Sequence, residues 1–473
     1  MSVSSHDSGS TSGADTSFSA LPLGAAQHAN LVAMGYSSMT PVQAASLPPA
    51  LAGRDVLARA KTGSGKTAAF GIALIHGLKD AERTRAQALV LCPTRELVDQ
   101  VIGELRLLAR VRPNTRLLAL VGGRALAAQK QSLLHGADIL VGTPGRVLDH
   151  LRRGTLDLGG ATTLVLDEAD RMLDMGFADD MDAIIAAMPR ERQTLLFSAT
   201  YPGTIAAMSR RVQRDPLTVS VDATHRPGTI EQLFCETAPE ARGDALLTLY
   251  RHFRPASSLV FCQTRKSCDA VASLLRQHRI EALALHGDLE QGERDAVLVQ
   301  FANGSCPVVV ATDVAARGLD VPGLAAVFNY DLPRDGAVYL HRIGRTGRAG
   351  ETGRAVSLFV AAEAWRLDAI AAETGEPCSR LALPSLEADP RFVLRGAMAT
   401  LEVNAGRRQK LRPGDLLGAL TGEGQVPGAS IGKISIFDNR AFVAIDRSRA
   451  REAVAFLAGG RVKGRRLRVR RLR

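Results

Sequence analysis

Two clusters of residues in the first half of the chain combine side-chain types and spacings that could carry out chemistry. The first is the run AKTGSGKT at residues 60–67, which follows a short apolar stretch and precedes a helical pattern. In such a run Gly63 and Gly65 let main-chain N–H groups turn toward phosphate oxygens. Lys66 would reach the β- and γ-phosphates of a nucleotide, and the Thr67 hydroxyl would ligate Mg²⁺. The first position is Ala where the general pattern has Gly, but the Gly-Lys-Thr end that binds phosphate is intact.

The second cluster lies farther along the chain, where an apolar run ends in the acids Asp167, Glu168 and Asp170. Asp167 is suited to hold Mg²⁺, and Glu168 is suited to polarise a water that attacks the terminal phosphate. Acids at the end of a strand could instead cap the next helix. Their combination with a phosphate-binding loop favours the catalytic interpretation. The sequence therefore predicts hydrolysis of ATP, with Mg²⁺ as a cofactor.

Short apolar runs rich in β-branched residues alternate with longer helical patterns along most of the chain. These runs show no alternation of apolar and polar residues, so both faces of each strand must be buried. Buried strands separated by helices are typical of parallel sheets built from β-α-β units. Examples are residues 88–92, 138–141, 163–166 and 194–197.

An internal repeat indicates two copies of one α/β domain. The segment LVLCPTR at residues 89–95 resembles LVFCQTR at 259–265, and each copy is followed by a second apolar run that ends in Thr. The spacing is nearly the same in both, since the threonines are 49 residues apart in the first copy (94 to 143) and 48 apart in the second (264 to 312). An apolar run followed by Thr could recur by chance, but the shared Thr-Arg and the matched spacing favour duplication.

The composition of the 473-residue chain is that of a globular protein, with 46% hydrophobic and 23% charged residues. The net charge of +11 favours a polyanionic partner, of which nucleic acid is the commonest, although charge for solubility alone is the alternative. The six cysteines include no C-x-x-C pair, so we expect reduced thiols in a cytoplasmic protein. No apolar run approaches the roughly 20 residues of a membrane span, so no membrane segment is expected.

These patterns predict four parts of the chain. Residues 1–17 are rich in Ser, Gly and Thr, which predicts a disordered leader. Residues 18–220 and 228–375 are expected to be the two α/β domains, joined by a polar stretch with a Pro-Gly turn. Residues 395–473 differ, because their patterns follow the order β-α-β-β-α-β of a split β-α-β fold. Its strands are expected near residues 400–404, 432–437, 441–445 and 461–470.

With the phosphate loop, the sequence DEAD at residues 167–170 resembles the signature of the DEAD-box RNA helicases. Further motifs of that family follow in order from about residue 18 to 370. The resemblance implies two tandem RecA-like domains that hydrolyse ATP when RNA is bound. Phe18 and the segment after it resemble the family's Q motif, which implies that Tyr36 stacks on adenine and that the Gln43 amide selects ATP over GTP.

The same resemblance assigns RNA contacts to motifs in both domains. PTREL, GG and TPGR in the first domain, and QTR and ATDVAARG in the second, match motifs that face RNA in the family. Contacts of this kind go to the sugar-phosphate backbone and imply little sequence reading by the core. The residues assigned to RNA are Thr94, Arg95, Gly123, Thr143, Gly145, Arg146, Arg265, Thr312 and Arg317.

The resemblance also places part of the nucleotide site in the second domain. The segment HRIGRTGR at residues 341–348 resembles a motif whose arginines act as fingers on the γ-phosphate, here Arg345 and Arg348. Asp320 is the nucleotide contact implied in the preceding motif. Because ATP and the arginines belong to different domains, hydrolysis would require closure of the domains, and ATP and RNA would bind cooperatively.

The C-terminal part resembles the RNA-binding domain of the DbpA branch of bacterial DEAD-box proteins. The resemblance rests on residues 410–421, 431–434 and 461–465. It implies a small α+β domain like an RNA-recognition motif (RRM), with a hairpin of 23S ribosomal RNA in pre-50S particles as its partner. Its strands carry few aromatic residues, so recognition is expected to use loops and basic edges. The expected contacts are Arg407, Arg408, Lys410, Lys433 and Arg440.

Two alternatives remain open from the sequence, which also gives no indication of an oligomeric state. A DNA helicase of the same superfamily would share the ATP-binding motifs, but the Q motif and the complete DEAD sequence favour RNA. An ATP-gated RNA clamp or assembly scaffold would use the same residues with little unwinding. Unwinding of a short duplex, measured with and without ATP, would separate a helicase from a clamp.

Overall fold

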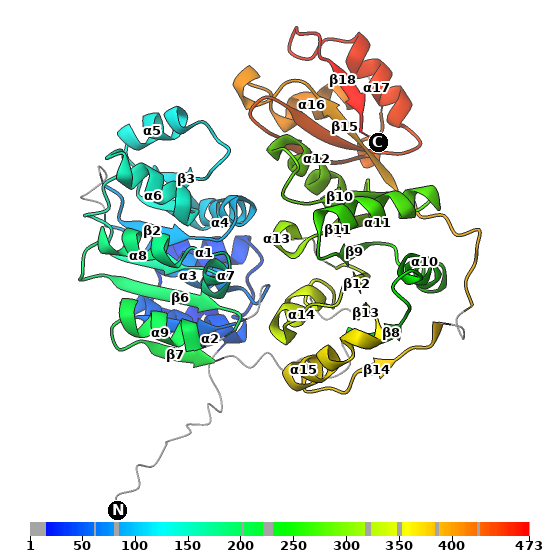
Figure 1. The fold of residues 1–473 in the computed structure, drawn as a ribbon. Coiled ribbons are helices and arrows are strands. Elements are labelled where there is room, and N and C mark those ends of the chain that lie inside the picture. Colours follow the sequence, from blue (N-terminus) through cyan, green and yellow to red (C-terminus); the bar gives the residue numbers. More distant parts are fainter. Residues whose placement is uncertain are drawn as a thin grey trace, which may run out of the picture. The chain divides into compact units, whose positions relative to one another are not determined.

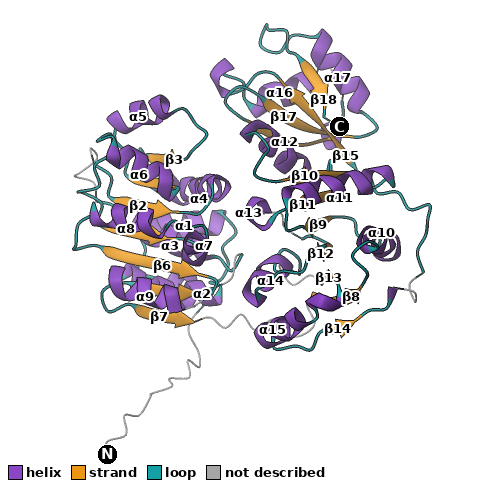
Figure 2. Cartoon of the chain, viewed as in Figure 1, coloured by secondary structure: helices purple, strands orange, loops and turns teal. Residues whose placement is uncertain are grey.

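The computed structural model divides into two compact units, residues 1–224 and 225–473. Figure 1 colours the chain along its sequence, and Figure 2 colours it by secondary structure. In the described part of the chain, no helix is both long enough and apolar enough to cross a membrane. The predicted domain junction and most of the predicted leader lie outside the described residues. Those described are 16–60, 63–79, 85–200, 203–220, 230–316, 323–347, 352–383, 387–422 and 426–472.

The first unit contains a parallel sheet that, within the described residues, has seven strands in the order β3-β4-β2-β5-β6-β1-β7. Consecutive residues of a strand point to opposite faces, and here both faces are buried. In β5, for example, Leu164 and Leu166 enter one core while Val165 enters the other. The strands are β1 (Val56–Arg59), β2 (Ala88–Leu91), β3 (Leu117–Leu120), β4 (Ile139–Gly142), β5 (Thr163–Leu166), β6 (Gln193–Ser198) and β7 (Leu217–Ser220).

Helices cover the two faces of this sheet (Figure 1). Helix α4 shows why such segments are helical, because its buried residues recur at three- and four-residue spacings, from Leu97 to Leu108, and form one apolar face. The helices are η1 (Phe18–Ala20), α1 (Ala25–Ala33), α2 (Pro41–Leu51), α3 (Lys66–Gly77), α4 (Arg95–Leu108), η2 (Ala109–Val111), α5 (Leu126–Leu134), α6 (Pro144–Arg152), α7 (Ala169–Asp174), α8 (Ala178–Ala186) and α9 (Gly203–Val212).

The second unit repeats this sheet in the order β10-β11-β9-β12-β13-β8-β14, which is the first order strand for strand. The predicted pair of RecA-like parallel-sheet domains is therefore confirmed. The strands are β8 (Ile230–Glu236), β9 (Ser258–Phe261), β10 (Ala282–Leu285), β11 (Val308–Ala311), β12 (Ala326–Asn329), β13 (Gly353–Phe359) and β14 (Ser379–Arg380). The helices are α10 (Arg242–Phe253), α11 (Arg265–Gln277), α12 (Gln291–Ala302), α13 (Asp313–Ala316), α14 (Gly336–Ile343), η3 (Ala361–Glu363) and α15 (Trp365–Thr374).

A small antiparallel sheet, β16-β17-β15-β18, completes the second unit and confirms the predicted α+β module. One prediction was wrong in its length. A strand was expected over residues 461–470, but the structure has only the short strand β18 (Val469–Arg471) at the end of that range. Lys463 and Gly464 have left-handed φ angles of 52° and 73°, so the chain turns there instead of extending. The elements are β15 (Met398–Val403), η5 (Arg407–Gln409), α16 (Pro413–Thr421), η6 (Gly428–Ser430), β16 (Ile431–Ile436), β17 (Ala441–Asp446), α17 (Ala450–Gly459) and β18 (Val469–Arg471).

Candidate ATP and RNA sites

The phosphate loop joins β1 to α3 at the carboxyl edge of the first sheet. Gly63 and Gly65 have φ angles of 82° and 90°, a region that glycine enters without a steric penalty. Lys66 begins α3 and is 5% exposed, and its Nζ has no hydrogen-bond partner among the described residues. A buried ammonium without a partner is costly, so this position fits a negatively charged ligand such as a phosphate group. Positions 61 and 62 of the loop lie outside the described residues.

The acids follow β5, which is separated from β1 only by β6. Asp167 is buried, and its Oδ1 has no partner within the described part of the chain. Burial raises the pKa of Asp167 to about 7, against the opposing effect of the Lys66 ammonium. Glu168 has a left-handed φ of 52°, a strained conformation of the kind that concentrates at functional sites. The unpartnered carboxylate oxygen of Asp167 and the half-buried Thr67 beside Lys66 fit a bound cation.

Asp170, to which the sequence interpretation gave no role, joins these acids to the end of the neighbouring strand. Its Oδ2 accepts hydrogen bonds from the Ala199 and Thr200 main-chain N–H groups, at 3.1 and 2.9 Å, and from Thr200 Oγ1 at 2.9 Å. The segment Ser-Ala-Thr at residues 198–200 is thus tied to the third acid of the DEAD sequence. Thr200, a hydroxyl residue two positions after the end of β6, was the sequence signal for this link.

The Q-motif residues contact the phosphate loop directly. Thr40 Oγ1 donates to the Ser64 carbonyl at 2.7 Å. The Gln43 amide donates to the Gly65 carbonyl at 3.0 Å and accepts from the Thr40 N–H at 2.8 Å. A Cβ at Gly65 would meet the Gln43 amide nitrogen at 2.5 Å, so only glycine lets the two approach this closely.

The two aromatic residues predicted near the nucleotide pack against each other. Phe18 is buried, and its ring meets that of Tyr36 edge-on, with centroids 5.7 Å apart. The Tyr36 hydroxyl donates to Glu104 of α4 at 3.0 Å. Burial, together with this carboxylate, raises the pKa of Tyr36. This pair is therefore fixed to the first sheet's helices, and the stacking of Tyr36 on adenine remains a prediction.

The predicted RNA residues of the first domain follow β2, β3 and β4. Thr94 caps α4, since its side chain accepts from the Leu97 N–H at 3.3 Å. Arg95 lies over Gly123, whose φ is 74°, and a Cβ at that glycine would collide with the guanidinium. Thr143 and Gly145 lie at the start of α6, and Arg146 donates from Nη1 to the Arg124 carbonyl at 3.1 Å.

The strand order divides this sheet edge into two regions. The residues predicted for ATP follow β1 and β5, with β6 between them, whereas those predicted for RNA follow the adjacent strands β2, β4 and β3. The carboxyl ends of parallel strands meet at one edge, which is where ligands bind to open α/β sheets. A nucleotide region and an RNA region can thus lie side by side, with β5 bordering both.

The second domain presents its predicted residues at the equivalent strands. Arg265 follows β9 and pairs with Asp288, which follows β10, while Thr312 follows β11. Arg345 lies just beyond α14 and is 8% exposed. Three predicted residues, Arg317, Asp320 and Arg348, lie outside the described residues, so their placement is not tested.

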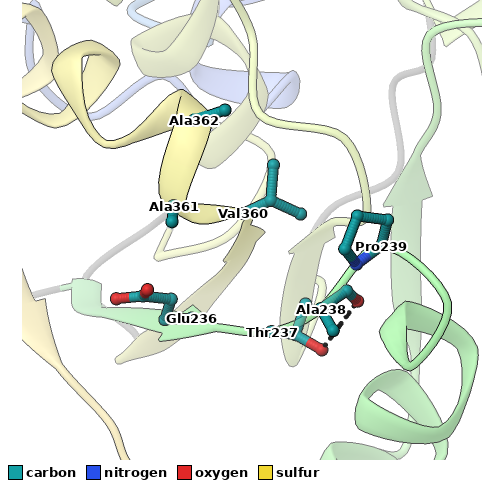
Figure 3. Close-up of a pocket in the computed structure, with 7 residues that line it drawn as sticks. All are labelled: Glu236, Thr237, Ala238, Pro239, Val360, Ala361 and Ala362. Carbon is teal, nitrogen blue, oxygen red and sulfur yellow. Dashed lines mark hydrogen bonds between the residues drawn. The ribbon is translucent and has the colours of Figure 1, made fainter.

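A pocket of about 620 Å³ lies elsewhere in the second domain, beyond the ends of β8 and β13 (Figure 3). It contains none of the residues predicted from the sequence. Its walls offer the Glu236 carboxylate, the Thr237 hydroxyl and otherwise small apolar side chains and main chain. None of these lining residues is a cation that could hold a phosphate, so we assign no nucleotide to the pocket. The lining residues are Glu236, Thr237, Ala238, Pro239, Val360, Ala361 and Ala362.

One face of the C-terminal sheet packs on its own two helices, and the other face contacts the second RecA-like domain. Thr400 of β15 donates to Ser305 Oγ at 2.8 Å and accepts from Asn303 Nδ2 at 2.9 Å. Phe442 of β17 is fully buried and lies outside the core that the helices cover. An RRM commonly stacks bases on aromatic residues of this face. In this structure Phe442 lies under the guanidinium of Arg440, which in turn pairs with Asp295 of the second domain.

Charged pairs surround this contact. Arg447 holds Glu281 with two hydrogen bonds, Nη1 to Oε1 at 2.7 Å and Nη2 to Oε2 at 2.6 Å. Arg440 donates to Asp295 of α12 at 3.0 Å, and its contact with RNA remains a prediction. The other predicted contacts, Arg407, Arg408, Lys410 and Lys433, are exposed.

Comparisons with known proteins agree with this architecture. Three family models match successive parts of the chain: DEAD/DEAH box helicase at residues 40–208, helicase conserved C-terminal domain at 241–350 and DbpA RNA binding domain at 400–471. The chain is 51% identical over 465 residues to the ATP-dependent RNA helicase DbpA of Escherichia coli (strain K12), which covers 97% of this chain and 100% of that protein. It is 41% identical over 355 residues to the DEAD-box ATP-dependent RNA helicase CshA of Bacillus subtilis (strain 168), covering 75% and 72%.

A solved structure gives the same picture for the two RecA-like domains. The structure of S. cerevisiae Dbp5 bound to RNA and ADP BeF3 covers 78% of this chain and 96% of its own, with 31% identity and a TM-score of 0.70. The chain therefore belongs to the DEAD-box family of ATP-dependent RNA helicases. Within that family it is of the DbpA type, since its C-terminal module matches the DbpA RNA-binding domain and the likeness spans almost the whole chain. It is thus an ATPase that binds RNA through both its helicase core and this module.

Proposed function

We propose that this helicase remodels 23S ribosomal RNA during assembly of the large ribosomal subunit in the cytoplasm, with a hairpin of that RNA bound by the C-terminal module. The observation that carries this proposal is the match of residues 400–471 to the DbpA RNA-binding domain. Exposed basic side chains at the edges of the module support it, because cations at the surface can contact phosphates.

The geometry of the first domain supports definite roles in ATP hydrolysis. Lys66 binds the β- and γ-phosphates, and Glu168 accepts a proton from the attacking water and orients it. Thr67 and Asp167 would hold Mg²⁺, which when bound neutralises charge on the phosphates. Asp170 supports this arrangement by fixing the end of β6 beside the acids.

The arginines of the second domain complete the proposed site. Arg345 and Arg348 stabilise the charge on the γ-phosphate when the two domains close, a role worth on the order of 10³–10⁵ in rate. RNA that contacts both domains favours the closed state, so RNA binding and ATP hydrolysis are coupled. The remaining nucleotide contacts that we propose are Phe18, Tyr36, Gln43 and Asp320.

The test is ATPase activity of the full chain with 23S rRNA fragments and with unrelated structured RNA of equal length. We expect stronger stimulation by fragments that contain the target hairpin. Replacing Arg407 and Lys410 by Ser should abolish this preference, whereas replacing Arg449 and Arg451 of the same module should only weaken binding of all RNAs. Equal stimulation by every RNA in the unmodified protein would refute the rRNA assignment.

A further inference from the structure

A largely buried chain of ion pairs runs through the second RecA-like domain outside the motifs assigned to ATP and RNA. At its centre is Arg242 of α10, which donates from Nη1 to Asp331 and from Nη2 to Glu363, both at 2.6 Å. These side chains are only 12%, 15% and 17% exposed. Glu363 also accepts from Arg366 at 2.9 Å. Charged side chains that are this well buried need partners, so these ion pairs hold the four side chains in place.

Asp331 connects Arg242 to two motifs at once. Its Oδ2 accepts from the main-chain N–H of Gln263 at 2.8 Å, and its carbonyl accepts from Arg342 Nη1 at 2.6 Å. Gln263 lies two residues before Arg265, whose proposed partner is RNA. Arg342 lies three residues before Arg345, whose proposed partner is the γ-phosphate. Asp331 thus joins Gln263, in the motif predicted to face RNA, to Arg342 of α14, the helix that ends two residues before Arg345.

The other contacts of Arg342 make it sensitive to Asp331. Its Nε and Nη2 hold both oxygens of Asp313, at 2.7 and 2.8 Å, and its Nη1 also donates to Asn329 at 3.0 Å. If Asp331 lost Arg242, its carboxylate would keep a single hydrogen bond among the described residues, from the Gln263 N–H, and would carry a large desolvation penalty. The Arg342 guanidinium already contacts the Asp331 carbonyl, and if it turned toward the Asp331 carboxylate it would break its fork on Asp313.

We propose that Arg242 is a positioning residue for RNA-coupled ATP hydrolysis. By neutralising Asp331, it fixes the position of helix α14 relative to the end of β9. RNA bound at Arg265 can then determine where Arg345 lies. The proposal rests on the functions proposed above for Arg265 and Arg345. Arg242 itself contacts neither ligand in this role.

The experiment compares Arg242→Met and Arg242→Lys in the full chain, with Arg354→Met as a matched control. Arg354 also pairs with a carboxylate in this domain, Glu231 at 2.6 Å, and this pair does not include Asp331, Glu363 or Arg342. ATPase rates are measured across RNA concentrations, and urea unfolding gives the folded fraction. Arg242→Met should lower the RNA-saturated kcat by roughly three- to thirtyfold with little change in the KM for ATP, and Arg242→Lys should recover part of it. Arg354→Met should keep the unmodified kcat.

Two outcomes would overturn the proposal. One is an unchanged RNA-saturated kcat in folded Arg242→Met, and the other is a loss that the unfolded fraction fully explains. A failure of the roles proposed for Arg265 and Arg345 looks different, because replacing either of them by Ala would then leave the RNA-saturated kcat of the full chain unchanged.

Discussion

The contact between the C-terminal module and the second RecA-like domain can be tested by reversing one charge. Arg447 and Glu281 form a bidentate pair, and their side chains are 27% and 36% exposed. An exposed ion pair contributes about 0–1 kcal/mol, and this geometry favours the upper end of that range. Arg447→Glu replaces the attraction with a repulsion of similar size, so docking should weaken by about 2 kcal/mol, or roughly thirtyfold in its equilibrium constant.

Hydrogen exchange reports this opening directly. The Gly396 N–H donates to Glu281 at 3.0 Å, and the neighbouring loop at residues 303–305 lies against β15. Both segments should exchange faster in Arg447→Glu, whereas Arg451→Glu on the exposed side of α17 should leave them unchanged. The double reversal Glu281→Arg with Arg447→Glu should restore most of the protection. Exchange in the double variant as fast as in the single one would refute the pairing as the source of docking.

Three further outcomes follow from the first domain. Glu168→Gln should abolish ATP turnover while ATP and RNA still bind, and undiminished RNA-stimulated ATPase would exclude the role given to Glu168. Asp170→Asn should lower stability by about 1–3 kcal/mol in urea unfolding, because an uncharged amide cannot accept three hydrogen bonds at one oxygen as the carboxylate does. Gly123→Val should weaken RNA binding measured by fluorescence anisotropy but leave ATP binding intact, since its side chain would displace Arg95 in a left-handed turn.

The sequence predicted most of what depends on local chemistry. The phosphate loop needs glycine at fixed positions and Lys66 beside them, and these requirements are visible in one short run. The duplicated fold was also predictable, because buried parallel strands leave long apolar runs with a constant spacing. The structure adds that both sheets share one strand order, so Thr94 and Thr264 cap equivalent helices, α4 and α11.

Contacts between distant segments could not be predicted in the same way. The two hydrogen bonds of Arg242 join it to Asp331, 89 residues farther along the chain, and to Glu363, 121 residues farther. Nothing in the local sequence marks these residues as partners. The sequence suggested an RNA contact for Arg440 but gave no sign of its pairing with Asp295, which lies 145 residues away. The length of the last strand was predicted wrongly for a different reason. The alternation of Arg with Val and Leu resembled a strand, but the chain turns at Lys463 and Gly464.

The covered sheet face gives a physical reason for the scarcity of aromatic residues in the C-terminal module. A face that binds bases must present exposed rings, whereas Thr400 hydrogen-bonds to the second domain and Phe442 lies under the guanidinium of Arg440, 5.3 Å from the ring centroid. A base could stack on Phe442 only after these contacts separate. RNA bound by the docked module must therefore use other surfaces, which is where the exposed Arg407, Lys410 and Lys433 lie.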